Sequence, residues 1–310
     1  MPTPIVVFAG YDPNDPTMRL CRENWRNYAA RHPDISFVVN CVDSNLGFGT
    51  YAVSNGDVRL GYKEIIGEGN HERPYEEWGP NEWAIGRNRW ILLLTYLFEK
   101  FPEPFWAVYT NITGFICFER LTEFLSMLEC RSVYAGLPIY YIPDDFIYIA
   151  GSHTIFSSDT LKIVFDYIRD NPPSPDASDI TIGRSLLHCR KLMIPIGNFL
   201  SNDFPEDSSL VSKTTLAQNY VNQGYFFFRY KNYYPGIPRE HIDPFLQSFT
   251  MGLCQTIPPD LGEITAKTKE FGLRMQRMEG MACVGSLPRQ FSGTDLLQQD
   301  PIQRTRLTVL

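Results

Sequence analysis

Two short apolar runs near the N-terminus flank a segment with helical spacing. Residues 5–8 (IVVF) are continuously apolar, and residues 36–42 (SFVVNCV) repeat that form. Such runs are typical of strands that are buried on both faces of a sheet. Residues 19–31, between them, have the mixed apolar and charged pattern of a helix. The pattern therefore predicts a β-α-β unit of the nucleotide-binding type at the start of the chain.

Three later segments extend this pattern. Residues 88–100 predict a helix that Pro102 and Pro104 end, and residues 105–109 predict a central strand after it. Residues 159–169 predict an amphipathic helix with its apolar side chains on one face. The order of elements favours an α/β fold, with a mixed, mostly parallel sheet that is flanked by helices.

The remaining regions are less regular. Residues 45–80 are rich in Gly, Asn and Glu, and they predict loops with one short strand at residues 64–66. Residues 239–253 and 261–278 predict helices. The polar tail from about residue 285 has no clear period, which is typical of a flexible or partner-bound terminus.

An aromatic segment, residues 220–234 (YVNQGYFFFRYKNYY), contains eight Tyr or Phe side chains. One interpretation is a pair of strands that covers the core. The other is a platform on which an acceptor sugar stacks, with Arg229 and Lys231 available to neutralise a phosphate group.

Composition limits the class of protein. A chain of 310 residues with 44% hydrophobic content can bury one large core plus an appendage. We therefore expect a core of residues 1–205 and a C-terminal extension of residues 206–310. The net charge of −7 argues against a nucleic acid as the main partner, because nucleic-acid-binding surfaces are basic.

Cysteine usage and hydropathy predict a cytoplasmic protein. The seven cysteines are scattered and form no C-x-x-C pair, which argues against structural zinc and against a disulfide framework. The apolar residues 91–97 are too few to span a membrane and have charged neighbours. Residues 1–10 lack the basic start and the apolar length of a signal peptide.

Residues that follow the first two strands are candidates for ligand contacts. Open α/β sheets bind ligands at the carboxyl ends of their strands. Gly10 and Tyr11 end the first predicted strand, and Asp43 follows the second. We expect these three residues to contact a nucleotide base and ribose.

A later motif resembles that of a known enzyme family. Residues 148–157 (YIAGSHTIFS) are Gly-containing and precede a helix, and residues 178–183 (SDITIG) open the next one. Together they resemble Fringe and related β1,3-glycosyltransferases, whose pattern is (Glu/Asp)-Asp-x-x-x-Gly, with Ser178 here at the first acidic position. The resemblance runs through residues 4–205. It implies a GT-A-type, Rossmann-like fold and an inverting glycosyl transfer in which Asp179 is the general base.

One departure from the family pattern concerns the metal. The family's Asp-x-Asp, whose carboxylates hold a divalent cation, is replaced by Asn111, Ile112 and Thr113. The stretch that matches the family's metal-binding His is residues 199–203 (FLSND). Hard cations prefer carboxylate oxygens, so we expect no metal site and no cofactor, while dependence on Mn²⁺ or Mg²⁺ stays open. Asn111 also begins an N-glycosylation sequon, a weak alternative after an apolar strand.

The resemblance also assigns contacts to individual residues. Arg89 stands where the family has a cation facing the donor, and Arg184 is the next candidate, with Arg229 and Lys231 behind them. Asn111 and Thr113 would contact the donor, and Gly151, Ser152 and His153 the acceptor. A core histidine is the alternative for His153.

The resemblance predicts a soluble enzyme that binds a nucleotide sugar, most simply a UDP-sugar, and a carbohydrate or glycoconjugate acceptor. It would have no membrane span, and a second copy of the chain is an open option as a partner. The alternative is a catalytically inactive sugar- or nucleotide-binding module that kept the fold. An exposed Asp179 with cations opposite it would favour the enzyme.

Overall fold

The computed structural model of this chain describes residues 2–43, 45–61, 80–141, 144–171, 178–189, 191–195, 199–200, 210–230 and 239–256. Its centre is an eight-stranded sheet with the order β3-β4-β2-β1-β5-β8-β7-β9. The strands are β1 (Ile5–Gly10), β2 (Ile35–Val42), β3 (Thr50–Ser54), β4 (Asp57–Gly61), β5 (Trp106–Asn111), β7 (Val133–Tyr141), β8 (Phe146–Ser157) and β9 (Leu192–Pro195).

The sheet is mixed and mostly parallel, as predicted. Strand β1 pairs in parallel with β2 on one side and with β5 on the other, β2 with β4, and β7 with β9. Strand β8 runs antiparallel to β5 and β7, and β3 runs antiparallel to β4. A second, three-stranded sheet has the order β10 (Phe199–Leu200), β11 (Phe227–Arg229) and β6 (Gly114–Ile116).

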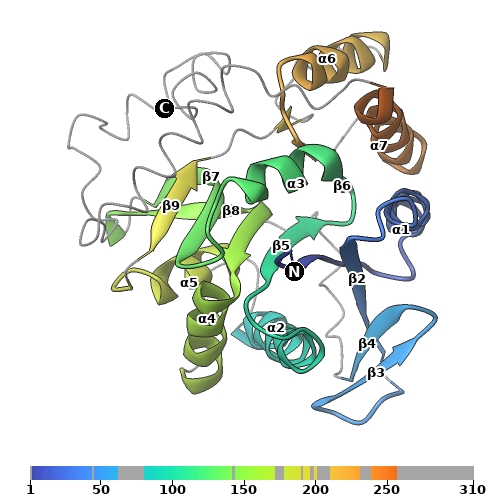
Figure 1. Ribbon diagram of the computed structural model, residues 1–310. Helices are drawn as coiled ribbons and strands as arrows, with labels where there is room; N and C mark the ends of the chain where they lie inside the picture. Colours follow the sequence, from blue (N-terminus) through green and yellow to red (C-terminus); the bar gives the residue numbers. More distant parts are fainter. Residues whose placement is uncertain are drawn as a thin grey trace.

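Helices cover both faces of the large sheet (Figure 1). Alternate residues of β1 point to opposite faces. Val7 belongs to a buried cluster with side chains of α1 (Pro16–Ala29), α3 (Phe118–Ser126) and α7 (Arg239–Thr256). Val6 and Phe8 belong to the opposite cluster, with α2 (Pro80–Lys100), α4 (Ser158–Asp170) and α5 (Ser178–Ser185). The fold is therefore a three-layer α/β architecture.

The C-terminal extension packs into the same core. Helix α6 (Leu210–Asn222) contacts α7, and α7 contacts α1. Val221, Phe227 and Leu246 share one hydrophobic cluster with Val7 and Val108 of the central strands. The described part of the extension thus contributes to the core, and the expected boundary at residue 205 stays a prediction.

Two segments differ from the sequence-based prediction. Residues 50–61 form the β3–β4 hairpin rather than a loop, because Asn55 and Gly56 adopt φ angles of 53° and 77° in a two-residue turn. Residues 220–222 end α6, and among the described residues 220–230 only 227–229 form a strand, so the expected strand pair is wrong over these residues. Gly224, with φ 88°, ends the helix. The predicted strand at 64–66, helix at 261–278 and tail from 285 lie outside the described residues.

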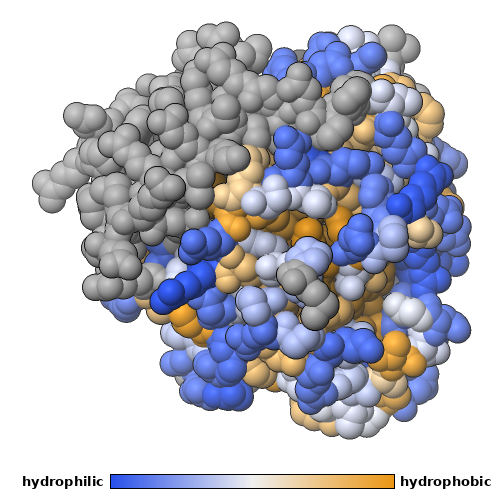
Figure 2. All heavy atoms as spheres, viewed as in Figure 1, coloured by the Kyte–Doolittle hydropathy of each residue, from blue (hydrophilic) through white to orange (hydrophobic). Residues whose placement is uncertain are grey.

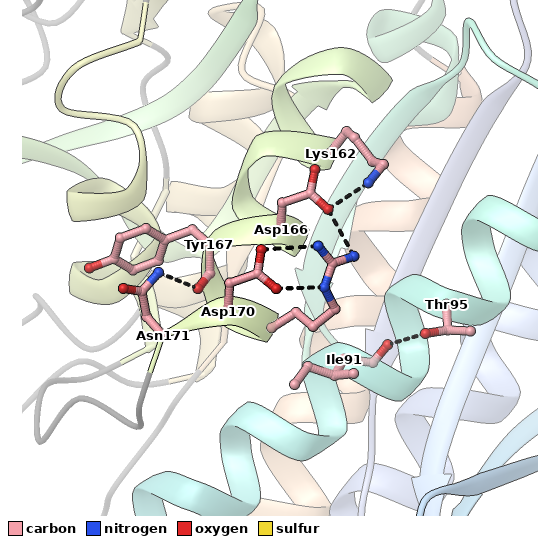
Figure 3. Close-up of polar contacts among 8 residues, drawn as sticks. Ile91, Thr95, Lys162, Asp166, Tyr167, Asp170 and Asn171 are labelled. Atoms are coloured by element: carbon pink, nitrogen blue, oxygen red, sulfur yellow. Dashed lines mark hydrogen bonds and ion pairs between the residues drawn. The ribbon is translucent and has the colours of Figure 1, made fainter.

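Charged side chains pair on the surface of α4. Figure 3 shows ion pairs at the end of α4, where Asp166 faces Lys162 at 2.6 Å and Arg169 at 3.1 Å. These side chains are exposed, so the pairs contribute little to stability. In Figure 2, hydrophilic residues cover much of the coloured surface, and hydrophobic ones gather near the centre of this face.

Two further findings concern the cysteines and the membrane prediction. None of the six cysteines in the described ranges forms a disulfide, and Cys21, Cys41, Cys117 and Cys254 are buried, as expected of core thiols. Among the described helices, none combines the length and the apolar character that crossing a bilayer requires.

Candidate active site

Three strand ends meet at one edge of the large sheet. Gly10, the last residue of β1, lies beside Asn40 of β2 and beside Asn111, the last residue of β5. The Tyr11 amide, where the chain leaves β1, donates a hydrogen bond to the Asn40 carbonyl oxygen at 2.9 Å. Carboxyl ends of parallel strands are where open α/β sheets bind ligands.

The Arg89 guanidinium lies across these strand ends. Its Nε donates to Asn40 Oδ1 at 2.9 Å, and its Nη2 approaches the Asn40 carbonyl oxygen at 3.4 Å. A Cβ atom added to Gly10 would stand 2.0 Å from Arg89 Nη2. Only glycine at position 10 therefore leaves room for the Arg89 guanidinium in this position. Helix α2 therefore delivers a positive charge to the edge where Gly10, Asn40 and Asn111 meet.

Asp179 reaches the same edge from the start of α5. Its Oδ2 accepts a hydrogen bond from the Gly151 amide at 3.0 Å, and its Oδ1 accepts one from the Ile180 amide at 3.0 Å. The Asn111 Nδ2 lies 3.5 Å from the Gly151 carbonyl oxygen. The Gly151 peptide group thus connects the acidic residue of α5 with the end of β5.

Gly183 allows α5 to approach β8 closely. A Cβ at this position would lie 2.5 Å from Tyr148 Cβ, and no shift of a flexible side chain would relieve that contact. The final residue of the SDITIG motif therefore sets the distance between helix and strand, which brings Asp179 to Gly151.

The environment of Asp179 favours proton acceptance. Burial raises the pKa of the Asp179 carboxyl, while the amides of Gly151 and Ile180 and the charge of Arg229 act in the opposite direction. Asp179 nevertheless stays partly accessible. A carboxylate with a raised pKa is a stronger general base than an ordinary Asp.

Side chains of α1 and α7 hold the turn that carries Asn111 and Thr113. Trp25 Nε1 lies 3.1 Å from the carbonyl oxygens of both Ile112 and Gly114. Gln247 Nε2 of α7 donates to the same two oxygens, at 2.9 and 2.6 Å. Both side chains are fully buried, so this turn is fixed by two helices that are far apart in the sequence. The contribution of Gln247 was not visible in the sequence, because only the tertiary fold brings α7 here.

The predicted base and ribose contacts lie beside this edge but already have partners. The Tyr11 hydroxyl donates to Asp57 Oδ2 at 3.1 Å, and the Arg22 guanidinium lies 5.1 Å from the Tyr11 ring centre. Asp43 accepts from Arg59 Nη1 at 3.1 Å, and hydrogen bonds from Asn45 lower its pKa. Their contact with a nucleotide stays a prediction.

Arg184 pairs with Asp144. It lies near the end of α5, and its Nε donates to Asp144 Oδ2 at 2.7 Å. Its guanidinium also lies 5.8 Å from the Tyr141 ring centre. This position beside the β7–β8 connection gives no support to the expected donor contact of Arg184.

Ser152 and His153 are enclosed in the core, whereas Gly151 is partly accessible. The His153 ring stacks on Phe227 at 4.9 Å and has no exposed surface. Burial, followed by the charge of Arg229, lowers the pKa of His153 to about 3, so the ring is neutral. The geometry fits the core-histidine alternative better than the expected acceptor contact.

Asn111 and Thr113 do not fit a divalent cation. Asn111 directs its amide nitrogen toward Gly151, and Thr113 is buried. Across the part of the chain that is described, no three His, Cys, Asp or Glu side chains converge on a point that could hold a metal. Neutral ligands alone bind Mg²⁺ or Mn²⁺ poorly. Residues 201–203 and Lys231, which also belong to the predictions, lie outside the described residues.

Comparisons with known proteins found matches among solved structures. No protein-family model matches the chain, and no curated protein does so. A solved structure to which the chain is similar is a glycosyltransferase involved in the glycosylation of the major capsid of PBCV-1. The sequence identity is 14% and the TM-score 0.42, over 79% of this chain and 98% of that chain. A likeness of this degree assigns no activity to the present protein.

Proposed function

We propose that the protein is an inverting glycosyltransferase that moves a sugar from a nucleotide-sugar donor to an acceptor hydroxyl. One observation carries the proposal: the Asp179 carboxylate, with its raised pKa, stands at the same sheet edge as the Arg89 guanidinium. The resemblance of residues 178–183 to the motif of the β1,3-glycosyltransferases supports the same role for Asp179.

The proposed reaction is a single displacement at C1 of the donor sugar. The acceptor oxygen forms a bond to C1, and its proton moves to the Asp179 carboxylate. The bond between C1 and the phosphate oxygen breaks, and its electron pair leaves with the nucleoside diphosphate. The transition state resembles an oxocarbenium ion, and negative charge grows on the leaving phosphate.

The donor nucleotide would lie along the ends of β1, β2 and β5, with a UDP-sugar as the simplest candidate. Arg89 would face the diphosphate, because its guanidinium crosses these strand ends and is fixed there by Asn40. The sugar would then lie near the Gly151 peptide and Asp179. A carbohydrate or glycoconjugate hydroxyl is the proposed acceptor.

We propose that the transfer needs no divalent cation, and the residues of the Asn111–Thr113 turn support this proposal. We expect the transfer rate to stay the same in excess EDTA, because neither Asn111 nor Thr113 offers the negative charge that holds a divalent cation. The measurement compares initial rates of nucleoside diphosphate release with EDTA and with added Mn²⁺. Loss of activity in EDTA that Mn²⁺ restores would contradict this expectation.

The second candidate is a binding module that retains the fold without catalysis, and the missing carboxylates at residues 111–113 favour it. The test is incubation with a panel of nucleotide sugars and carbohydrate acceptors, with mass spectrometry of the products. Glycoside formation by the wild type supports the transferase. Tight binding of a nucleotide sugar without any transfer would favour the binding module.

A further inference from the structure

Strand β11 brings an arginine from the C-terminal extension to the edge of the large sheet. Arg229 pairs with Gly114 in the antiparallel β11–β6 ladder, directly after the turn that carries Asn111 and Thr113. Successive side chains of a strand alternate between its two faces. Phe227 stacks on His153 of β8, and Phe228 stacks on Phe115 on the other side. Arg229 therefore points to the same side as Phe227, toward β8.

This direction leads toward Asp179. His153 lies two positions after Gly151, whose amide holds the Asp179 carboxylate. Burial lowers the pKa of His153 and raises the pKa of Asp179; the positive charge of Arg229 adds to the first shift and opposes the second, as expected of a nearby cation. Among the described residues, none forms a hydrogen bond or a close ion pair with the Arg229 guanidinium. Within the described part of the chain, its hydrogen-bond donors therefore have no protein acceptor.

Tyr109 of β5 packs against Trp90, the residue that follows Arg89 in α2. The centre of its ring lies 5.5 Å from the ring centre of Phe8 and 5.3 Å from that of Trp90. The charges of Arg89, Arg229 and Asp179 all act on the Tyr109 hydroxyl. Burial raises the pKa of Tyr109, so the hydroxyl keeps its proton and can donate it in a hydrogen bond. No described residue accepts that hydrogen bond.

We propose that Arg89, Tyr109 and Arg229 together form the binding site for the diphosphate group of the donor. This inference rests on the proposed function and names what takes the place of a metal ion. Two guanidinium groups offset the charge of the diphosphate, and the tyrosine hydroxyl adds a neutral donor. The described part of the C-terminal extension is then a component of the active site, because it supplies one of the two cations.

The test is calorimetric titration of nucleoside diphosphates, inorganic pyrophosphate and unphosphorylated nucleosides into the wild type and variants. Arg229→Gln is expected to weaken diphosphate and pyrophosphate binding by roughly 10- to 100-fold, the range for hydrogen bonds to charged groups. Binding of the nucleoside should not change. Arg229→Lys should recover part of the affinity, and Tyr109→Phe should lose a smaller part. Arg169→Ala is the matched control, because it removes an exposed arginine from α4.

The outcomes separate this inference from the proposed function. Equal pyrophosphate affinity in the wild type and Arg229→Gln, with both proteins folded by circular dichroism, would overturn the diphosphate site. Pyrophosphate binding that depends on Arg229, in a protein that transfers no sugar, would support the diphosphate site and remove the transferase proposal.

Discussion

Replacing Asp179 by Asn is expected to lower the rate of sugar transfer by about 10²- to 10⁴-fold, the usual loss when a general base is removed. Asn keeps the size of the side chain and an oxygen that can accept from the Gly151 amide. It cannot take the proton of the acceptor hydroxyl. Donor affinity should hardly change, so the loss should appear in kcat. Near wild-type turnover in this variant would remove Asp179 from its role.

A stability measurement distinguishes this role from a structural one. A carboxyl whose pKa is raised by folding stabilises the folded state more as the pH falls. At neutral pH its ionised form therefore lowers the stability of the folded state. Asp179→Asn should therefore melt at the same temperature as the wild type or higher. Asp57→Asn is the contrasting control. Asp57 is a buried partner of Arg22 and Arg26, and its loss should destabilise the fold by roughly 3 to 5 kcal/mol.

The same group sets the expected pH dependence. Among the described residues, the charged and titratable groups that act on or respond to Asp179 are Arg229 of β11, Tyr109 of β5 and Tyr134 of β7. Since burial raises the pKa of Asp179, kcat/KM should fall as the pH drops through a value above the ordinary 3.8 of an aspartate. Arg229→Gln removes an attractive charge, so it should move this acid limb to higher pH.

Replacing Arg89 by Ala is expected to weaken binding of the nucleoside diphosphate by roughly 1.5 to 3 kcal/mol. Arg89 is fixed by Asn40 above Gly10, so its guanidinium is oriented before the ligand arrives. Arg89→Lys should recover only part of the affinity, because an ammonium group lacks the bidentate geometry. Calorimetric titration measures both variants, with Arg169→Ala as the control for the loss of one positive charge. Unchanged affinity in Arg89→Ala would leave Arg229 as the cation at the diphosphate.

Local patterns in the sequence were sufficient to predict much of the fold. The apolar runs at residues 5–8 and 36–42 are β1 and β2, and the helix between them is α1. The helix at 159–169 is α4 within one residue at each end. Asp179 also opens α5, as the SDITIG motif predicted. These features depend on residues that are close together in the chain.

Contacts between distant segments could not be predicted in this way. Arg229 was only a secondary candidate, because the pairing of β11 with β6 joins segments that are far apart in the sequence. Gln247 was absent from the candidates for the same reason. The β3–β4 hairpin was different, since Asn55 and Gly56 are a local turn signal within a segment that was interpreted by composition.

The anomeric configuration of the product is the most direct test of the proposed displacement at C1. The measurement is proton NMR of the reaction mixture as sugar transfer proceeds, with a donor of known anomeric configuration and with Asp179→Asn in parallel. We expect the wild type to form a glycoside of inverted configuration and the variant to form almost none. A product of retained configuration, or equal product formation by both proteins, would contradict Asp179 as the base of a single displacement.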